Sequence, residues 1–202
     1  MKTATLHLPA TLLALLIHQA SATTLPTIEL RELTRDADLV VKVQVLSGET
    51  LGVGESSCGA KYTALVEESF KGSSAGATIE FGNHYGYEIG NRYILFLVKP
   101  GTAHEPMMST NSMYMQEKAE FQRRCVSLLS RSTVMHSGYG ALRIGWTSEF
   151  QYKDGVRVPT RYIALPETTR TTPSMASEYD QYSGLVWVRL EEMSQLIHEL
   201  AK

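Results

Sequence analysis

The sequence predicts a mainly β protein, a small antiparallel barrel or sandwich with helices at its periphery. Residues 39–46, LVVKVQVL, alternate between apolar and polar positions, as in a strand with one buried face. Glycine-rich turns separate the apolar stretches at short intervals, which is typical of antiparallel sheets rather than β-α-β units. The clearest helical patterns lie near the two ends of the mature chain.

Three further strands are predicted after 39–46. Residues 62–70, YTALVEESF, would place Tyr62, Val66 and Phe70 on one face. Glu68 interrupts that face, so we expect a curl or bulge that brings its carboxylate to water. ATIEF at 77–81 is a short third strand, and YILFLV at 93–98 is apolar on both faces. The last pattern predicts a central strand that is covered on two sides.

The other segments give weaker patterns. We expect a short helix in 25–36, and an amphipathic helix or an irregular excursion in 114–130. Strands are expected in 138–152 and 161–165 around a hairpin turn at Asp154-Gly155, followed by a mobile surface loop in 167–181. The chain should end with a strand in 184–190 and a terminal helix in 191–202, which has Met193, Leu196, Ile197 and Leu200 on one face.

The first residues predict export. Lys2 precedes an apolar run at 8–17, which is too short to span a bilayer as a helix, and small residues follow at 20–22. We expect a signal peptide over residues 1–22, cleaved after Ala22, although an N-terminal amphipathic helix is the alternative. The remaining residues 23–202 suit a single domain with an extension from about residue 101. The mature protein would be secreted or periplasmic, without an integral membrane segment.

Charge disfavours a nucleic-acid partner. The full chain has a formal net charge of −2, and loss of Lys2 with the leader makes it −3. No basic block or stripe occurs, whereas binding to phosphates depends on clustered lysine and arginine.

Cysteine usage predicts one disulfide. The chain contains two cysteines, Cys58 and Cys125, which can form a single intramolecular pair in an oxidising compartment. Two buried free thiols are the alternative. Neither cysteine has a second ligand at CxxC-like spacing, so a zinc site is not expected.

The order of features in residues 37–98 resembles the netrin-like module family, which includes the tissue inhibitors of metalloproteinases (TIMPs). The resemblance lies in ADLVVKVQVLSGE, CGAKYTALVEESFKG, GATIEF and GNRYILFLV, and it looks like bacterial secreted proteins of this type. It implies an OB-like five-stranded antiparallel barrel, here followed by a C-terminal β/α extension. The inhibitors of this family chelate zinc through an N-terminal cysteine. This mechanism does not carry over, because the expected mature chain begins at Thr23.

No motif predicts an enzyme or a cofactor. The mature histidines, His84, His104, His136 and His198, form no HExxH pattern, and no G-x-S-x-G occurs. His136 and Ser137 are adjacent, so on a strand they would point to opposite faces. A metal site assembled from residues of different loops remains an alternative, but we expect no bound metal.

The best candidate contact surface is the loop 83–90, NHYGYEIG, with His84, Tyr85 and Tyr87. Tyrosine gives contact area at low entropic cost, which suits protein or glycan partners. The alternative is a tyrosine-rich turn that closes the barrel. A second candidate is the loop around Tyr179 and Tyr182.

These features favour an exported, non-enzymatic module that binds a protein partner. The second hypothesis is a binder of glycans or cell-wall polymers, which predicts a row of exposed aromatic side chains on one face. The third is a hydrolase with a site assembled from distant loops, which predicts a concave pocket holding a histidine and a carboxylate within hydrogen-bond reach.

Overall fold

The computed structural model describes residues 25–53, 56–82, 86–99, 125, 128, 130–146, 154–174 and 178–202. The elements are, in chain order, β1 (Ile28–Glu29), α1 (Leu30–Asp36), β2 (Leu39–Val53), β3 (Ser56–Lys71), β4 (Thr78–Gly82), β5 (Arg92–Val98), β6 (Thr133–Val134), the 3-10 turn η2 (His136–Gly138), β7 (Ala141–Trp146), β8 (Asp154–Pro159), β9 (Ile163–Ala164), β10 (Thr172–Pro173), α3 (Glu178–Ser183), β11 (Leu185–Arg189) and α4 (Leu190–Leu200).

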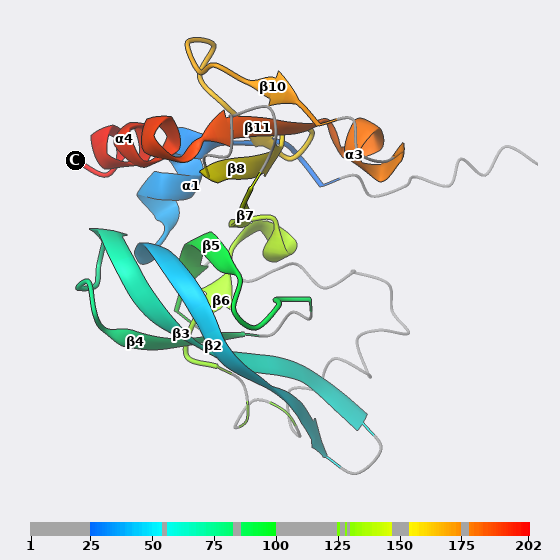
Figure 1. Cartoon of the computed structure of the whole chain (residues 1–202). Helices are drawn as coiled ribbons and strands as arrows, with labels where there is room; N and C mark the ends of the chain where they lie inside the picture. The colour runs from blue at the N-terminus through cyan, green and yellow to red at the C-terminus, as the bar shows by residue number, and fades with distance from the viewer. Residues whose placement is uncertain are drawn as a thin grey trace, which may run out of the picture.

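Five strands close into a barrel (Figure 1). The strands β2, β3 and β4 form an antiparallel meander, β4 pairs in parallel with β6, and β6 and β2 both pair antiparallel with β5. This ring is the strand arrangement of an OB-like barrel. The predicted fold class is therefore confirmed, and the fifth barrel strand comes from beyond residue 101.

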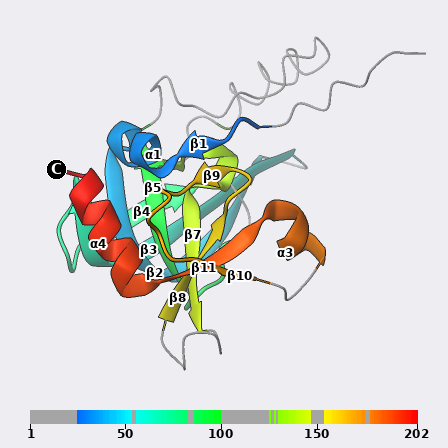
Figure 2. The same cartoon turned by 90° about the horizontal axis from the view of Figure 1, so that it is seen from above.

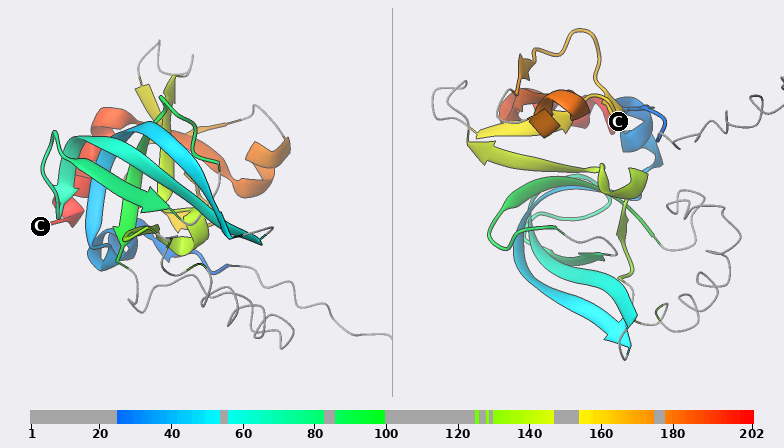
Figure 3. Two further views of the ribbon diagram at one scale, coloured as in Figure 1. Left: turned by 90° about the horizontal axis from the view of Figure 1, so that it is seen from below. Right: turned by 90° about the vertical axis from the view of Figure 1, so that its right-hand side faces the viewer.

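A second group of strands extends the sheet away from the barrel. From β5 the order continues through β7, β8, β11 and β10, all antiparallel, while β1 and β9 form a separate parallel pair. Figure 3 shows this outer sheet lying above the barrel, and Figure 2 shows α1 and α4 together at its side. Within the described residues, no helix is both long and apolar enough to cross a membrane.

The strand β5 is buried on both faces, as its apolar pattern predicts. Leu95 and Leu97 face the barrel interior, where they pack with the apolar side chains of β2, β3 and β4. Ile94 and Phe96 face a second core formed with α1, α4 and the outer sheet. All four side chains have no exposed surface. One strand therefore belongs to two hydrophobic cores.

The chain between β6 and β7 makes a short excursion at the level of Phe96. Thr133–Val134 pair with the end of β5, and Ala141 resumes the pairing opposite Leu95. Between them, His136 and Ser137 both have φ of 52°, which is uncommon for residues other than glycine. The Phe96 amide donates to the Gly140 carbonyl at 2.8 Å. The excursion divides what would be one strand, so that β6 stays in the barrel while β7 enters the outer sheet.

The strand β3 carries the irregularity that Glu68 predicts. The pairing with β2 shifts register between Lys42 and Val43, so Glu68 lies opposite Lys42 and the two side chains form an ion pair at 2.6 Å. A second shift follows between Val40 and Val41. The prediction that Phe70 shares the face of Tyr62 is wrong, because these shifts turn Phe70 to the second core.

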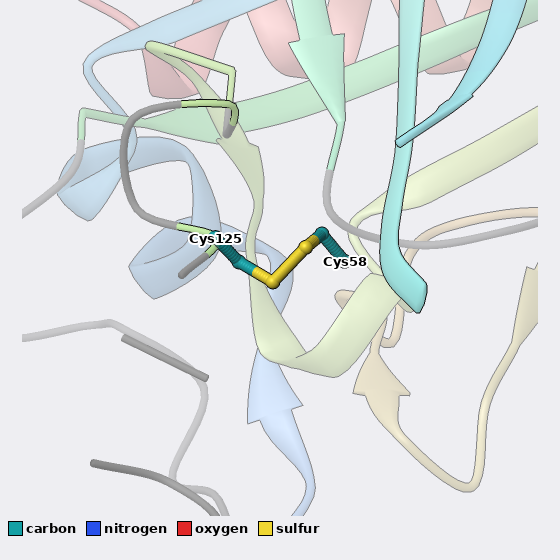
Figure 4. Close-up of a disulfide and its surroundings, with 2 residues drawn as sticks. All are labelled: Cys58 and Cys125. Carbon is teal, nitrogen blue, oxygen red and sulfur yellow. A yellow bond between two sulfur atoms is a disulfide. The ribbon is translucent and has the colours of Figure 1, made fainter. Parts of the chain in front are cut away.

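The predicted disulfide Cys58–Cys125 is present (Figure 4). Its Cα atoms lie 5.4 Å apart and both cysteines are buried, in a small cluster with Leu51 and Leu128. The bond joins residues 67 positions apart, so the chain-entropy estimate gives a contribution of about 4 kcal/mol. It fixes the projecting end of the β2–β3 hairpin to the chain that precedes β6.

Several weaker predictions need correction. Asp154-Gly155 is not a hairpin turn but the start of β8, because Gly155 pairs with Gly145 of β7. The segment 167–181 is not only a loop, since it contains β10 and the beginning of α3. The first helix begins at Leu30, after β1. The terminal helix α4 is confirmed, and most of 114–130 lies outside the described residues.

We predict that Leu95→Ala and Phe96→Ala each destabilise the protein, although their side chains point to opposite faces. Each change removes a fully buried side chain, which costs about 2–5 kcal/mol. Urea unfolding followed by circular dichroism measures this cost, with exposed Gln195→Ala as the control. A near-neutral effect of Phe96→Ala would contradict the account of a second core.

Candidate functional site

The structure places one of the three candidate loop residues. Tyr87 is half-buried, and its ring makes edge contacts with Tyr62 at 5.1 Å, Phe81 at 5.1 Å and Tyr93 at 5.6 Å between centroids. Burial, reinforced by Tyr62 and Tyr93, raises the pKa of the Tyr87 hydroxyl. The ring thus packs against the barrel core.

The side chains at the other candidate positions are not among those that the structure describes. His84 and Tyr85 lie outside the described residues, as do the side chains of Tyr179 and Tyr182. Tyr87 therefore remains as the predicted residue from which a site can be built.

A hollow of about 480 Å³ opens beside Tyr87, where the barrel meets the outer sheet. This volume is within the usual range for small-ligand sites, roughly 300–1,000 Å³. Five parts of the chain contribute to its wall: the turn before β5, the strand β5, the excursion after β6, and the strands β7 and β8. The side chains important here are those of Tyr87, Glu88, Tyr93, Ser137, Arg143 and Arg157.

Strand register explains why these side chains meet. Tyr93 of β5 pairs with Arg143 of β7, and Arg157 of β8 pairs with Trp187 of β11. Ile144 of β7 pairs with Val156 of β8. Arg143 precedes Ile144 and Arg157 follows Val156, so the two arginines lie side by side on the antiparallel strands. Because side chains alternate between faces, all four point to the face opposite the second core. A row of aromatic and arginine side chains therefore runs from β5 onto the outer sheet, next to the hollow.

Arg157 is held firmly. Its Nη2 donates to Oδ1 of Asp180 at 3.1 Å, and the Asp180 side chain is only 5% exposed. Ser174 Oγ donates to the other carboxylate oxygen at 2.7 Å. The guanidinium also lies over the Trp187 ring, 5.7 Å from its centroid. A buried carboxylate and an aromatic ring together fix the direction of this arginine.

Arg143 is held weakly. Its Nη2 donates to Oε2 of Glu88 at 3.1 Å, but the two side chains are 42% and 61% exposed. The same carboxylate oxygen also accepts a hydrogen bond from the Asn91 side chain. Ion pairs this exposed contribute about 0–1 kcal/mol, so another carboxylate can replace Glu88 at little cost.

The arrangement offers guanidinium donors and phenol groups in a partly enclosed space. These groups suit polar and acidic ligands, since arginine donates to a carboxylate through two parallel bonds. The sequence-based reasoning missed Arg143, Arg157 and Trp187. Their signal was present as polar or bulky residues at alternate positions of apolar strands, but it does not show which strands are neighbours.

The two histidines that the structure describes, His136 and His198, do not line the hollow. His198 Nε2 lies 3.1 Å from Oε1 of Glu68, a carboxylate that also accepts from Lys42, and this cluster joins α4 to β3 outside the lining of the hollow. Burial lowers the pKa of His136, which precedes the lining residue Ser137. Across the residues that are described, no group of three or more histidine, cysteine or acidic side chains could hold a metal ion.

The fold and the hollow define a β protein in which an OB-like barrel carries an outer sheet, with a polar site where the two join. No protein-family model matches the chain. A search of curated proteins also finds no match.

The Glu68 cluster gives a prediction on pH. Despite partial burial, which acts in the opposite direction, hydrogen bonds from Lys42 and His198 lower the pKa of Glu68 below its ordinary value of 4.5. The ionised carboxylate therefore favours the folded state, and its contribution is present above about pH 4.5 and lost as pH falls through the folded-state pKa.

We expect Glu68→Gln to lower stability at neutral pH and to differ less from the native protein in more acidic buffer. Thermal unfolding across pH measures this, with exposed Glu191→Gln as the matched control. A stability difference that grows on acidification would contradict the direction of the pKa shift.

Proposed function

We propose that this protein is an exported, non-enzymatic binding module that contacts a protein partner through the hollow beside Tyr87. The observation that supports this most directly is the firmly held Arg157 beside the weakly held Arg143. Arginine and tyrosine are enriched among the residues that dominate protein interfaces. A rigid anchor next to an exchangeable ion pair is an arrangement suited to binding.

Export is part of the proposal. The leader pattern in residues 1–22 and the disulfide Cys58–Cys125 both fit an oxidising compartment, either the periplasm or the outside of the cell. We expect the mature protein to begin at Thr23. Intact mass measured without reductant checks both points, since an uncleaved N-terminus or two free thiols would count against export.

We also propose kinship with the netrin-like modules. The order of features in residues 37–98 supports it, and the OB-like barrel is the fold that the resemblance implies. Inhibition through an N-terminal cysteine is not part of the proposal.

A glycan ligand is the second candidate, and the row from Tyr93 to Trp187 favours it. Sugars stack on flat aromatic rings when one face of the ring is free. Here a Cβ at Gly145 would lie 3.4 Å from the Trp187 ring, and Arg157 lies over the ring. The ring is thus engaged in holding the sheet and the arginine, and we therefore prefer a protein partner.

The third hypothesis, a hydrolase, lacks its discriminating feature in the described part of the chain. The histidine and carboxylate within hydrogen-bond reach, His198 and Glu68, do not line the hollow.

Affinity capture tests the proposed function. We expect the tagged mature protein to recover a specific partner from periplasmic or culture extracts of its source, and Arg143→Ala to weaken recovery. The control is Arg31→Ala, an exposed arginine on α1. Recovery of nothing specific, or equal recovery with both variants, would count against the hollow as the contact surface.

A further inference from the structure

We propose that the hollow recognises a carboxylate from an acidic peptide segment of the partner, and that Glu88 occupies the carboxylate position until the partner binds. This inference deepens the proposed function and rests on it. The intramolecular pair of Arg143 and Glu88 would be exchanged for an intermolecular pair at the same guanidinium.

The first step is the difference between the two arginines. Arg157 keeps its partner, because Asp180 is almost fully buried and separation would leave an uncompensated charge in the interior. Arg143 and Glu88 are both well exposed, so their separation leaves two hydrated charges. Binding can therefore open the second pair without disturbing the first.

The second step is hydrogen-bonding capacity. A guanidinium has five N–H donors in a planar fork, and Nη2 of Arg157 is the atom that donates to Asp180. Both arginines contribute to the wall of the hollow and lie on the adjacent strands β7 and β8. An incoming carboxylate at Arg143 is thus placed next to a second guanidinium, whose direction is already fixed by Asp180.

The third step concerns the source of the carboxylate. The mature chain has a net charge of −3, so an acidic segment is not drawn to the surface in general and needs a local positive site. The phenols of Tyr87 and Tyr93 lie in the same wall, and tyrosine with arginine is the combination expected at a protein contact. These features favour an acidic peptide over a sugar acid.

A titration with labelled peptides tests the inference. The probe is a fluorescein-labelled peptide of alternating glutamate and glycine, with a glutamine–glycine peptide of equal length as the neutral control. We expect the acidic peptide alone to bind the mature protein, measured by fluorescence anisotropy at low ionic strength. Arg143→Gln should weaken binding by about two- to fivefold, which is the effect expected from the loss of one exposed ion pair.

Glu88→Gln gives the sharper outcome. It removes the competing carboxylate, so the acidic peptide should bind about two- to fivefold more tightly, although most substitutions in a binding site weaken binding. Arg157→Lys keeps a positive charge beside Asp180 but loses the planar fork, so it should weaken binding of the acidic peptide. The matched controls are Arg31→Gln and Glu191→Gln, which change charge at exposed sites on α1 and α4.

Three outcomes would overturn the inference: no binding of the acidic peptide, equal binding by native protein and Arg143→Gln, or no gain in affinity with Glu88→Gln. Binding of a galacturonate oligomer in place of the peptide, with the same dependence on Arg143, would overturn the assignment to a protein segment. Failure of the proposed function is distinguishable, because it would appear in extract capture as the absence of any partner.

Discussion

The structure depends on one strand that is buried on both faces. Arg92–Val98 is hydrogen-bonded to β2 on one edge and to β6 and β7 on the other. Its side chains alternate between the barrel core and the second core, so this single strand joins the two. Full burial of a large apolar side chain contributes about 1.5–3 kcal/mol, and β5 has several. Neither core is complete without it.

The candidate site is a consequence of this sharing. Since β6 and β7 pair with successive parts of the same edge of β5, the chain between them must leave the sheet and return. The excursion through His136 and Ser137 does so in a backbone conformation that costs free energy outside glycine. The hollow lies where this excursion faces the turn before β5. The route of the backbone thus creates the space, and Arg143 and Arg157 give it its chemistry.

Local sequence patterns predicted the features of this fold that do not depend on which strands are neighbours. The alternation in 39–46, the apolar run in 93–98 and the pairing of the two cysteines all follow from period, composition or elimination. The reversed face of Phe70 did not, because register shifts depend on the partner strand. The turn expected at Asp154-Gly155 failed for a related reason, since Gly155 pairs with Gly145 within the sheet. The arginines of the hollow come from strands whose adjacency no local pattern reveals.

Native-state hydrogen exchange tests the central claim most directly. If β5 belongs to both cores, its amides should be the most protected, and the barrel strands and outer-sheet strands should lose protection together as denaturant rises. The account predicts one free energy of opening for amides in β2, β5 and β8. Loss of protection in β7, β8 and β11 at a lower denaturant concentration, with the barrel still intact, would contradict it.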